Sequence, residues 1–194
     1  MKLIYEALIL TLSFLIVWFF KQSGLESLTG AAIGVLIAIY VLSNLRKKEK
    51  SEDTLHIFLL TTTILFLIGT TGGLSSFLFF LFYFVIFAIG FVMNPKSVFT
   101  FALLAVIFFL PDTNSKNFLQ SLIQLGSILL ISPLAYFFSE EYKNKEQKEL
   151  IADKAAKNIT KDVETILEEQ KDTITQKEKD ALKDILIETA EIKK

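Results

Sequence analysis

Long apolar runs separated by short polar or charged stretches fill the first two thirds of the chain. Six runs can be bounded by the charges and turn residues between them: residues 3–20, 25–45, 55–71, 77–93, 97–110 and 118–138. A helix that spans a bilayer needs about 20 predominantly apolar residues. The pattern predicts an all-α membrane protein with a six-span transmembrane domain over residues 1–138. The fifth run is short, so we expect it either to insert thinly or to form a re-entrant hairpin with the fourth.

The positive charges of the loops indicate the orientation of these spans. Residues 46–50 read RKKEK, and Lys and Arg are retained on the cytoplasmic side of a membrane. Counting outward from this loop, the N-terminus, Lys96 and the tail from Ser139 all lie inside. The outer loops then carry only Lys21 and Lys116 as basic residues. We predict a multi-pass protein of the cytoplasmic membrane with both termini in the cytoplasm.

The last apolar run continues without a clear break into a charged stretch over residues 139–170. We interpret that stretch as a signalling helix continuing from the last span. Pro133, one turn before the membrane boundary, lacks a backbone donor and is a candidate hinge. Along the charged part, positions spaced alternately by four and three form a heptad seam that packs against a partner helix. These positions are Ala152, Ala156, Ile159, Val163, Ile166 and Gln170.

Residues 171–194 are predicted to form the second helix of a hairpin. Thr175 and Glu178 match a T-x-x-E capping box, which marks a helix start. Apolar residues then recur at helical spacing on one face. A lone hairpin of this size buries too little apolar surface to be stable, so we expect two copies to pair as a four-helix bundle. The predicted dimer seam consists of Ala156, Ile159, Val163, Ile166, Leu182 and Ile185.

Composition removes several function classes. The 194 residues are 52% hydrophobic with a net charge of −1 and no cysteine, so disulfides, thiolate catalysis and nucleic-acid binding find no support. A metal site needs several ligands, and His56 is the only histidine. We predict no metal, no cofactor and no catalytic residue. We expect His56 to be an interfacial anchor, Glu6 to be a solvated carboxylate near the interface, and the Phe-rich fourth run to face lipid.

The loop between the third and fourth runs is the most distinctive in the chain, because two glycines permit backbone angles that other residues resist. On the predicted topology it faces outward. It is either a tight turn or a sensor loop. The sensor-loop candidates are Thr71, Gly72, Gly73, Ser75 and Ser76.

Three stretches carry a resemblance to a known family. TGGLSS, followed by FLFFLFYFVIFAIGF, resembles the outer turn and fourth span of the multi-span sensor regions of bacterial membrane histidine kinases, with Phe77 where a proline often stands. The junction ISPLAYFFSEEYKNK resembles the exit from the last span of such proteins. The tail is similar to their dimerisation and histidine-phosphotransfer hairpin, with DVETIL at residues 162–167.

The resemblance implies a degenerate sensor. Its register places Lys157 at the position of the phosphoacceptor histidine, and lysine cannot form a phosphohistidine. The Asn- and Gly-rich boxes of the ATP-binding domain are not present in this sequence. We expect a membrane-embedded sensor or scaffold for signal transduction that is not an enzyme, forms a homodimer in the lipid bilayer and has a possible cytosolic signalling partner.

Two other functions remain open. Six spans in about 140 residues also suit a small-molecule transport subunit, although the charged tail is unusual for one. Alternatively, the chain is a membrane anchor whose tail recruits a cytosolic partner.

Overall fold

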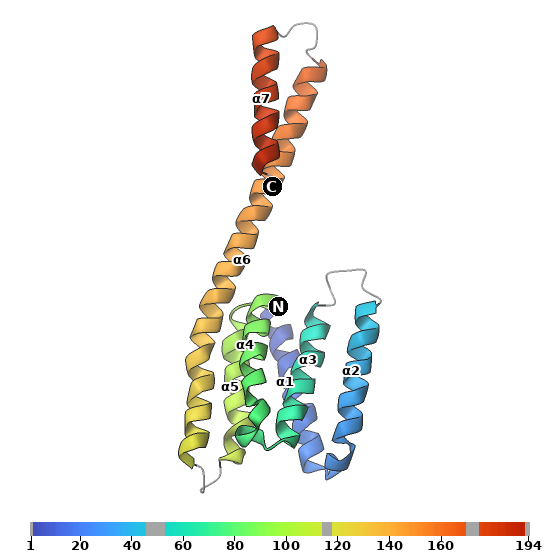
Figure 1. Cartoon of the computed structure of the whole chain (residues 1–194), viewed down its shortest axis with the longest axis vertical. Helices are drawn as coiled ribbons and strands as arrows, with labels where there is room; N and C mark the ends of the chain where they lie inside the picture. Colours follow the sequence, from blue (N-terminus) through green and yellow to red (C-terminus); the bar gives the residue numbers. More distant parts are fainter. Residues whose placement is uncertain (1, 46–52, 114–117, 170–174, 193–194) are drawn as a thin grey trace. The chain divides into compact units, whose positions relative to one another are not determined.

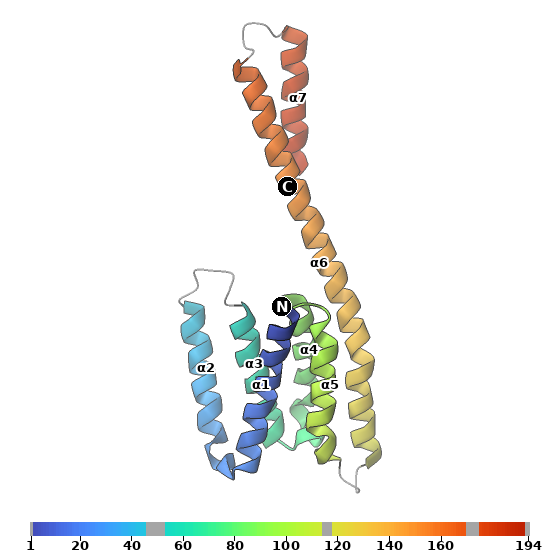
Figure 2. The ribbon, with the colours of Figure 1, turned by 180° about the vertical axis from the view of Figure 1, so that it is seen from behind.

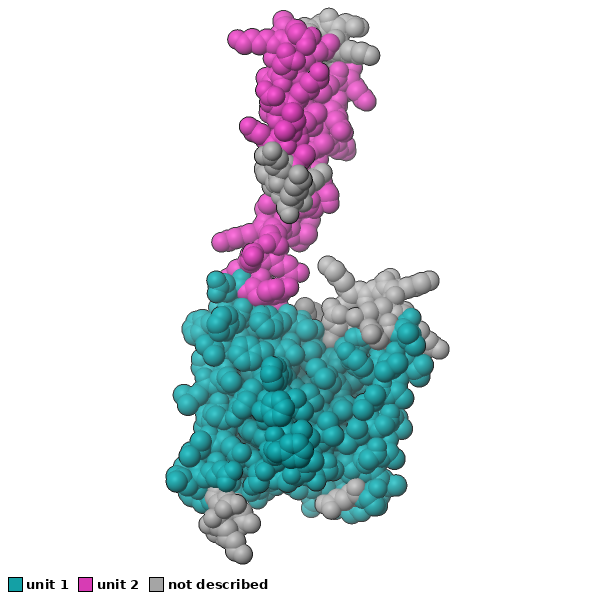
Figure 3. Space-filling view, viewed as in Figure 1, with its two compact units in different colours: residues 1–141 teal, residues 142–194 magenta. Residues whose placement is uncertain are grey.

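The computed structural model describes residues 2–45, 53–113, 118–169 and 175–192, and within these ranges every regular element is a helix (Figure 1). This confirms the prediction of an all-α protein. The chain forms two compact units, residues 1–141 and 142–194, close to the predicted boundary at residue 138 (Figure 3). The elements are α1 (Lys2–Gln22), η1 (Leu25–Leu28), α2 (Thr29–Leu45), α3 (Asp53–Thr70), η3 (Gly73–Ser75), η4 (Phe77–Phe79), α4 (Phe80–Val92), α5 (Ser97–Phe109), η5 (Leu110–Asp112), α6 (Phe118–Glu169) and α7 (Gln176–Ile192).

Two of these helices are long and apolar enough to cross a membrane. They are Leu3–Gln22 and the apolar part of Phe118–Glu169. The other four apolar stretches are shorter: Thr29–Ser43, Thr54–Thr70, Phe77–Val92 and Ser97–Asp112. Thus all six apolar runs are helical, but only two of the described helices meet the length and composition of a full span. In the second run, residues 25–28 form the separate 3-10 helix η1, and the third to fifth runs are themselves shorter than about 20 residues.

The core of the first unit lies among α1, α3, α4 and α5. In this unit α1 lies beside both α3 and α5, α2 beside α3, and α4 between α3 and α5 (Figures 1 and 2). Phe82 is fully buried, with its ring 5.0 Å from that of Phe101 and 5.7 Å from that of Phe109. The expectation that the Phe-rich run faces lipid is therefore wrong for Phe79 and Phe82. Phe84 of the same run is exposed, and its contact with lipid stays a prediction.

Large apolar side chains also cover the outside of this unit. Examples are Leu8 on α1, Val35 on α2, Leu103 on α5 and Leu130 on α6, all of them exposed. Contiguous exposed apolar surface is rare on soluble monomers and marks a surface that meets lipid or another protein. The apolar exterior and the two long apolar helices are compatible with association with a membrane.

The second unit consists of the charged part of α6 and the antiparallel α7. Ala156 and Val163 on α6 and Thr189 on α7 are buried, so they form the inner surface of the hairpin. The backbone N–H of Thr175 donates to Glu178 Oε2 at 2.9 Å, which is one half of the predicted capping box. The hydroxyl of Thr175 donates to the same oxygen at 2.7 Å. The predicted start of the second helix is thereby confirmed.

Candidate functional site

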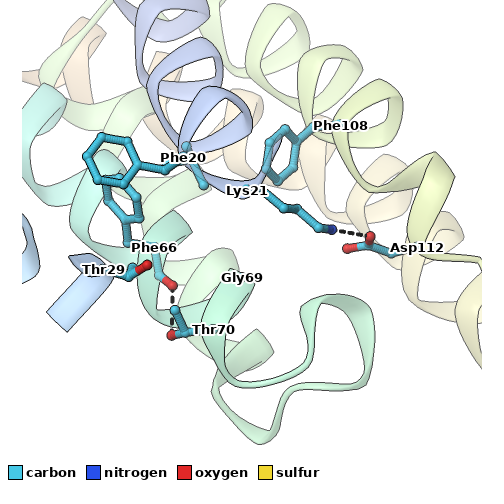
Figure 4. A pocket seen from close by; sticks show the side chains of 9 residues that line it. Phe20, Lys21, Thr29, Phe66, Gly69, Thr70, Phe108 and Asp112 are labelled. Carbon is cyan, nitrogen blue, oxygen red and sulfur yellow. Dashed lines mark hydrogen bonds and ion pairs between the residues drawn. The ribbon is translucent and has the colours of Figure 1, made fainter. Parts of the chain in front are cut away.

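A pocket of about 310 Å³ opens at the end of the first unit where α1 and α3 finish, and we call it the Lys21 pocket (Figure 4). Four segments supply its walls because α1, α3 and α5 end together here and α2 begins here. The lining residues are Val17, Phe20, Lys21, Thr29, Phe66, Gly69, Thr70, Phe108 and Asp112. Its volume lies at the lower end of the range of small-molecule sites, roughly 300–1,000 Å³.

The charged part of the Lys21 pocket is an ion pair. Lys21 Nζ donates to Asp112 Oδ1 at 2.5 Å, and the two side chains are 46% and 18% exposed. The pair joins the last turn of α1 to the short helix η5 that follows α5. Opposite it, the rings of Phe20 and Phe66 meet edge to face with centroids 5.2 Å apart (Figure 4). The pocket therefore combines one positive and one negative group with aromatic walls.

The predicted sensor loop lies at this same end and is in contact with the pocket through Asp112. Gly72 and Gly73 have φ angles of +117° and +60°, which only glycine adopts without strain. A β-carbon at Gly73 would collide with the carboxyl group of Asp112. The hydroxyls of Thr71 and Ser76 bond to each other, and Ser76 Oγ accepts from Leu78 N–H at 3.1 Å. The loop is thus a closed turn packed against the ion pair.

Of the sensor-loop candidates, Gly73 and Ser76 are buried while Thr71, Gly72 and Ser75 are exposed. The sequence reading found the loop from its two glycines. It did not find Asp112, because nothing in the local pattern shows that a residue after the fifth run meets Lys21, which lies 91 positions away.

The opposite end of the first unit, which we call the Glu6 end, holds a buried acid. Glu6 is 1% exposed, and its Oε2 accepts from the Asn94 backbone N–H at 3.0 Å and from the Ser97 hydroxyl at 2.6 Å. Glu6 Oε1 has no hydrogen-bond partner. The expectation of a solvated carboxylate is therefore wrong. Its partners are Asn94 in the turn after α4 and Ser97 at the first position of α5, so the pairing is a long-range feature that local position does not reveal.

His56 lies in a polar contact between α2 and α3. Its Nε2 is 3.0 Å from Ser43 Oγ, and its ring centroid is 5.2 Å from that of Tyr40. No group of three or more potential metal-ligating side chains occurs in the part of the chain that the structure describes.

The buried face of α6 in the first unit is lined by small polar side chains. The hydroxyls of Ser132 and Ser139 donate to the carbonyls of Ile128 and Ala135 in the same helix, each at 2.6 Å. Across the interface, Tyr83 of α4 shares a 2.6 Å hydrogen bond with Ser127. Ser132 and Ser139 therefore satisfy their hydroxyls within α6, whereas Ser127 also bonds to α4.

Further along, α6 and α4 approach closely, and Pro133 does not interrupt the helix. A β-carbon at Gly90 would collide with the Ser139 hydroxyl. The helix continues through Pro133 to Glu169 as one element. The role of Pro133 as a hinge stays a prediction.

The predicted dimer seam divides into two sets in the structure. Ala156 and Val163 are 1% and 6% exposed inside the hairpin, whereas Ile159 and Ile166 are 42% and 40% exposed. On α7, Ile185 is 39% exposed and Leu182 is half-buried. The hairpin thus uses alternate seam positions for its own core and leaves an isoleucine face uncovered.

Lys157, the position that the resemblance equates with a phosphoacceptor, lies on the exposed side of α6. Its Nζ is 2.7 Å from Asp153 Oδ2, an ion pair one helical turn apart. This geometry is that of an ordinary surface pair between positions i and i+4.

No protein-family model, curated protein or solved structure matches this chain. The resemblance to sensor histidine kinases therefore rests on the residues quoted above.

Proposed function

We propose that this protein is a membrane-embedded sensor or scaffold for signal transduction. It passes a conformational signal from the end of its bundle that holds the Lys21 pocket, here called the Lys21 end, through α6 to a dimeric cytoplasmic hairpin. It resembles a sensor histidine kinase that lacks its own phosphotransfer chemistry. The observation that carries the proposal is the continuity of α6, a single helix of 52 residues that contains both an apolar span and the first helix of the hairpin.

Six crossings of the membrane are part of this proposal. At the Glu6 end α1 bonds to Ser97, and at the Lys21 end it bonds to Asp112. The two ends of α5 and η5 therefore coincide with those of α1, over about 22 Å of helix at roughly 1.5 Å per residue. If α1 crosses the membrane, the short fifth segment crosses beside it. A re-entrant hairpin would return its end to the starting side.

The distribution of charge supports an orientation with both termini in the cytoplasm. Lys96, in the turn between α4 and α5, lies at the Glu6 end, and residues 46–50 lie outside the described residues. At the Lys21 end, the charge of Lys21 is paired with Asp112. Among the described residues, the position of Lys96 at the Glu6 end therefore agrees with a cytoplasmic face there. Lys116 also lies outside the described residues.

The proposed mechanism is a shift of α6 against the bundle. The buried serines of α6 bond to its own backbone, so translation or rotation of the helix breaks few bonds to its neighbours. Such a device needs two packings that differ by only a few kcal/mol. The output is a change in how two hairpins pair through the uncovered isoleucines.

The dimer is tested by cross-linking in a chain that contains no native cysteine. We expect Ile159→Cys and Ile166→Cys to form disulfide-linked dimers in membranes under mild oxidation. Val163→Cys, buried within the hairpin, should cross-link much less. Lys161→Cys, exposed about 200° around the helix from residue 159, is the matched control. Equal cross-linking at residues 159 and 161, or none at any position, would contradict the dimer.

The topology is tested with single-cysteine variants of the same cysteine-free chain. Ser75→Cys in the exposed loop should react with a membrane-impermeant maleimide in intact cells, and Lys145→Cys only after the cells are opened. Labelling of Lys145→Cys in intact cells would show that the tail lies outside the cytoplasm and would contradict the signalling proposal.

A transport subunit is the second candidate, and the Lys21 pocket favours it. The two functions differ in what the pocket does: a transport subunit must release its ligand on the opposite side. Uptake of a bound ligand into proteoliposomes would support transport, and binding without uptake supports a sensor. The third hypothesis is an anchor for a cytosolic partner. Recruitment of that partner would require only the tail, so it should persist when the Lys21 pocket is lost.

A further inference from the structure

We propose that the Lys21 pocket binds a small zwitterion with an apolar body, and that Asp112 connects its occupancy to the sensor loop. A zwitterion would be the ligand of the proposed sensor, and its role as the signal rests on the proposed function. Binding itself is measured without reference to signalling, so the two can fail separately.

The walls of the pocket select for an apolar body. The rings of Phe20, Phe66 and Phe108 line it, and Val17 and Gly69 complete the surface. A β-carbon at Gly69 would lie 3.9 Å from the nearest atom, which belongs to Val17, so the missing side chain leaves free space here. Polar groups contribute almost as much of the lining as apolar ones, so the site offers apolar walls beside polar partners.

The charges select for two opposite groups on the ligand. Lys21 and Asp112 are the charged residues of the lining, and they are paired with each other. A ligand with a single charge that engages either residue must compete with this pair and leaves the other charge without its partner. A zwitterion offers an anion to Lys21 and a cation to Asp112, so both charges remain paired after the original contact opens.

The uncharged groups favour placing the ligand cation near Thr70 and the aromatic rings. The Thr70 hydroxyl donates to the Phe66 carbonyl at 2.9 Å, so its oxygen remains free to accept from a ligand N–H. Aromatic faces also attract cations. The ligand anion then lies toward Lys21, the more exposed of the two charged side chains.

Asp112 connects the pocket to the loop because it contacts Gly73 directly. The carboxyl group occupies the space that a β-carbon at Gly73 would need. If Asp112 turns toward a ligand cation, it leaves this position, and the turn of residues 71–76 loses one of its packing contacts. Occupancy of the pocket therefore changes the environment of the predicted sensor loop.

The charge requirement is tested with three ligands of the same shape. Purified full-length protein is titrated with L-phenylalanine, with 3-phenylpropanoate, which is only anionic, and with 2-phenylethylamine, which is only cationic. Trp18, the single tryptophan, lines a neighbouring hollow with Lys21 and Phe108 and gives a fluorescence readout. We expect the zwitterion to bind about tenfold more tightly than either analogue, since one charged contact is lost in each.

Substitutions then locate the binding. Lys21→Gln and Asp112→Asn should each weaken binding of L-phenylalanine about tenfold, while Lys96→Gln at the Glu6 end should not. Gly69→Leu should fill the pocket and abolish binding. Gly34→Leu, where a β-carbon meets open space on α2, is the matched control. Helical content by circular dichroism shows whether each variant has folded.

The source of the zwitterion is tested with lipid. The same titration is carried out in nanodiscs of phosphatidylethanolamine, whose head is zwitterionic, and of phosphatidylglycerol, whose head is anionic. Weaker binding of L-phenylalanine in phosphatidylethanolamine supports a lipid head as the occupant, and equal binding in both supports a free solute. Equal affinity for the three ligands, no binding of any, or binding that survives Gly69→Leu overturns the proposal.

Discussion

Replacement of the buried Glu6 by alanine is expected to destabilise the first unit substantially. The substitution removes the oxygen that accepts from the Asn94 N–H at 3.0 Å and from the Ser97 hydroxyl at 2.6 Å. The buried Ser97 hydroxyl and the half-buried Asn94 N–H are then left without this partner, and loss of a buried partner costs about 1–3 kcal/mol. Burial of Glu6 with Oε1 unpartnered is itself unfavourable, which offsets part of the loss. We expect a net destabilisation of about 2–3 kcal/mol.

The measurement is the free energy of unfolding of detergent-solubilised protein, titrated with a denaturing detergent and followed by circular dichroism. Glu6→Gln keeps the shape and one acceptor oxygen, so it should cost about 1 kcal/mol or less. Ser97→Ala removes one of the two donors and should cost about 1 kcal/mol. In the double variant Glu6→Ala/Ser97→Ala, the two effects should be less than additive, because both substitutions remove the same contact.

The control is Glu141→Ala, which changes an exposed acid of the same unit and should leave stability unchanged. A cost of less than about 0.5 kcal/mol for Glu6→Ala would refute the reasoning, since it would show that Asn94 and Ser97 find equivalent partners without it.

Three further predictions concern the loop, the α4–α6 contact and the tail. Gly73→Ala forces a β-carbon onto a residue with φ of +60° and should lower the melting temperature, whereas an exposed Ser75→Ala should not. Tyr83→Phe removes the hydrogen bond to Ser127, so it should cost about 1 kcal/mol and change the cysteine cross-linking pattern of the tail; an unchanged pattern would argue against movement of α6. Hydrogen bonds from the Thr175 side chain and backbone lower the pKa of Glu178 below its ordinary value of 4.5, so the helicity of α7 should be fully present above that pH and fall as pH drops through the lowered pKa. Glu178→Gln should remove this dependence in a pH titration by circular dichroism.

Features set by local pattern could be read from the sequence. The apolar runs, the start of α7 at the Thr175–Glu178 motif and the unusual loop at Gly72 and Gly73 all depend on residues that are close together in the chain. Each was found in the structure as a helix, a cap or a turn with positive φ angles. Local chemistry was sufficient for these features because the same few residues both form and define them.

Features set by distant contacts could not be read in this way. Glu6 was expected in water because it lies near the start of a span, but its partners Asn94 and Ser97 lie 88 and 91 residues later in the chain. The ion pair of Lys21 and Asp112 likewise joins the ends of two helices that only the fold brings together. The heptad pattern showed that Val163 and Ile166 share a seam, but not that the chain's own α7 covers one and leaves the other exposed.

The continuity of α6 makes helical phase a quantity that can be set by mutation. Each residue of a helix turns the side chains that follow by about 100°. Inserting one residue in the exposed stretch after Tyr142 would redirect the isoleucine face by that angle, whereas inserting seven would nearly restore it. If α6 transmits the proposed signal as one rigid element, the output should vary with the same periodicity as residues are inserted. A foreign helical output domain joined to α6 in register should then also respond to the signal.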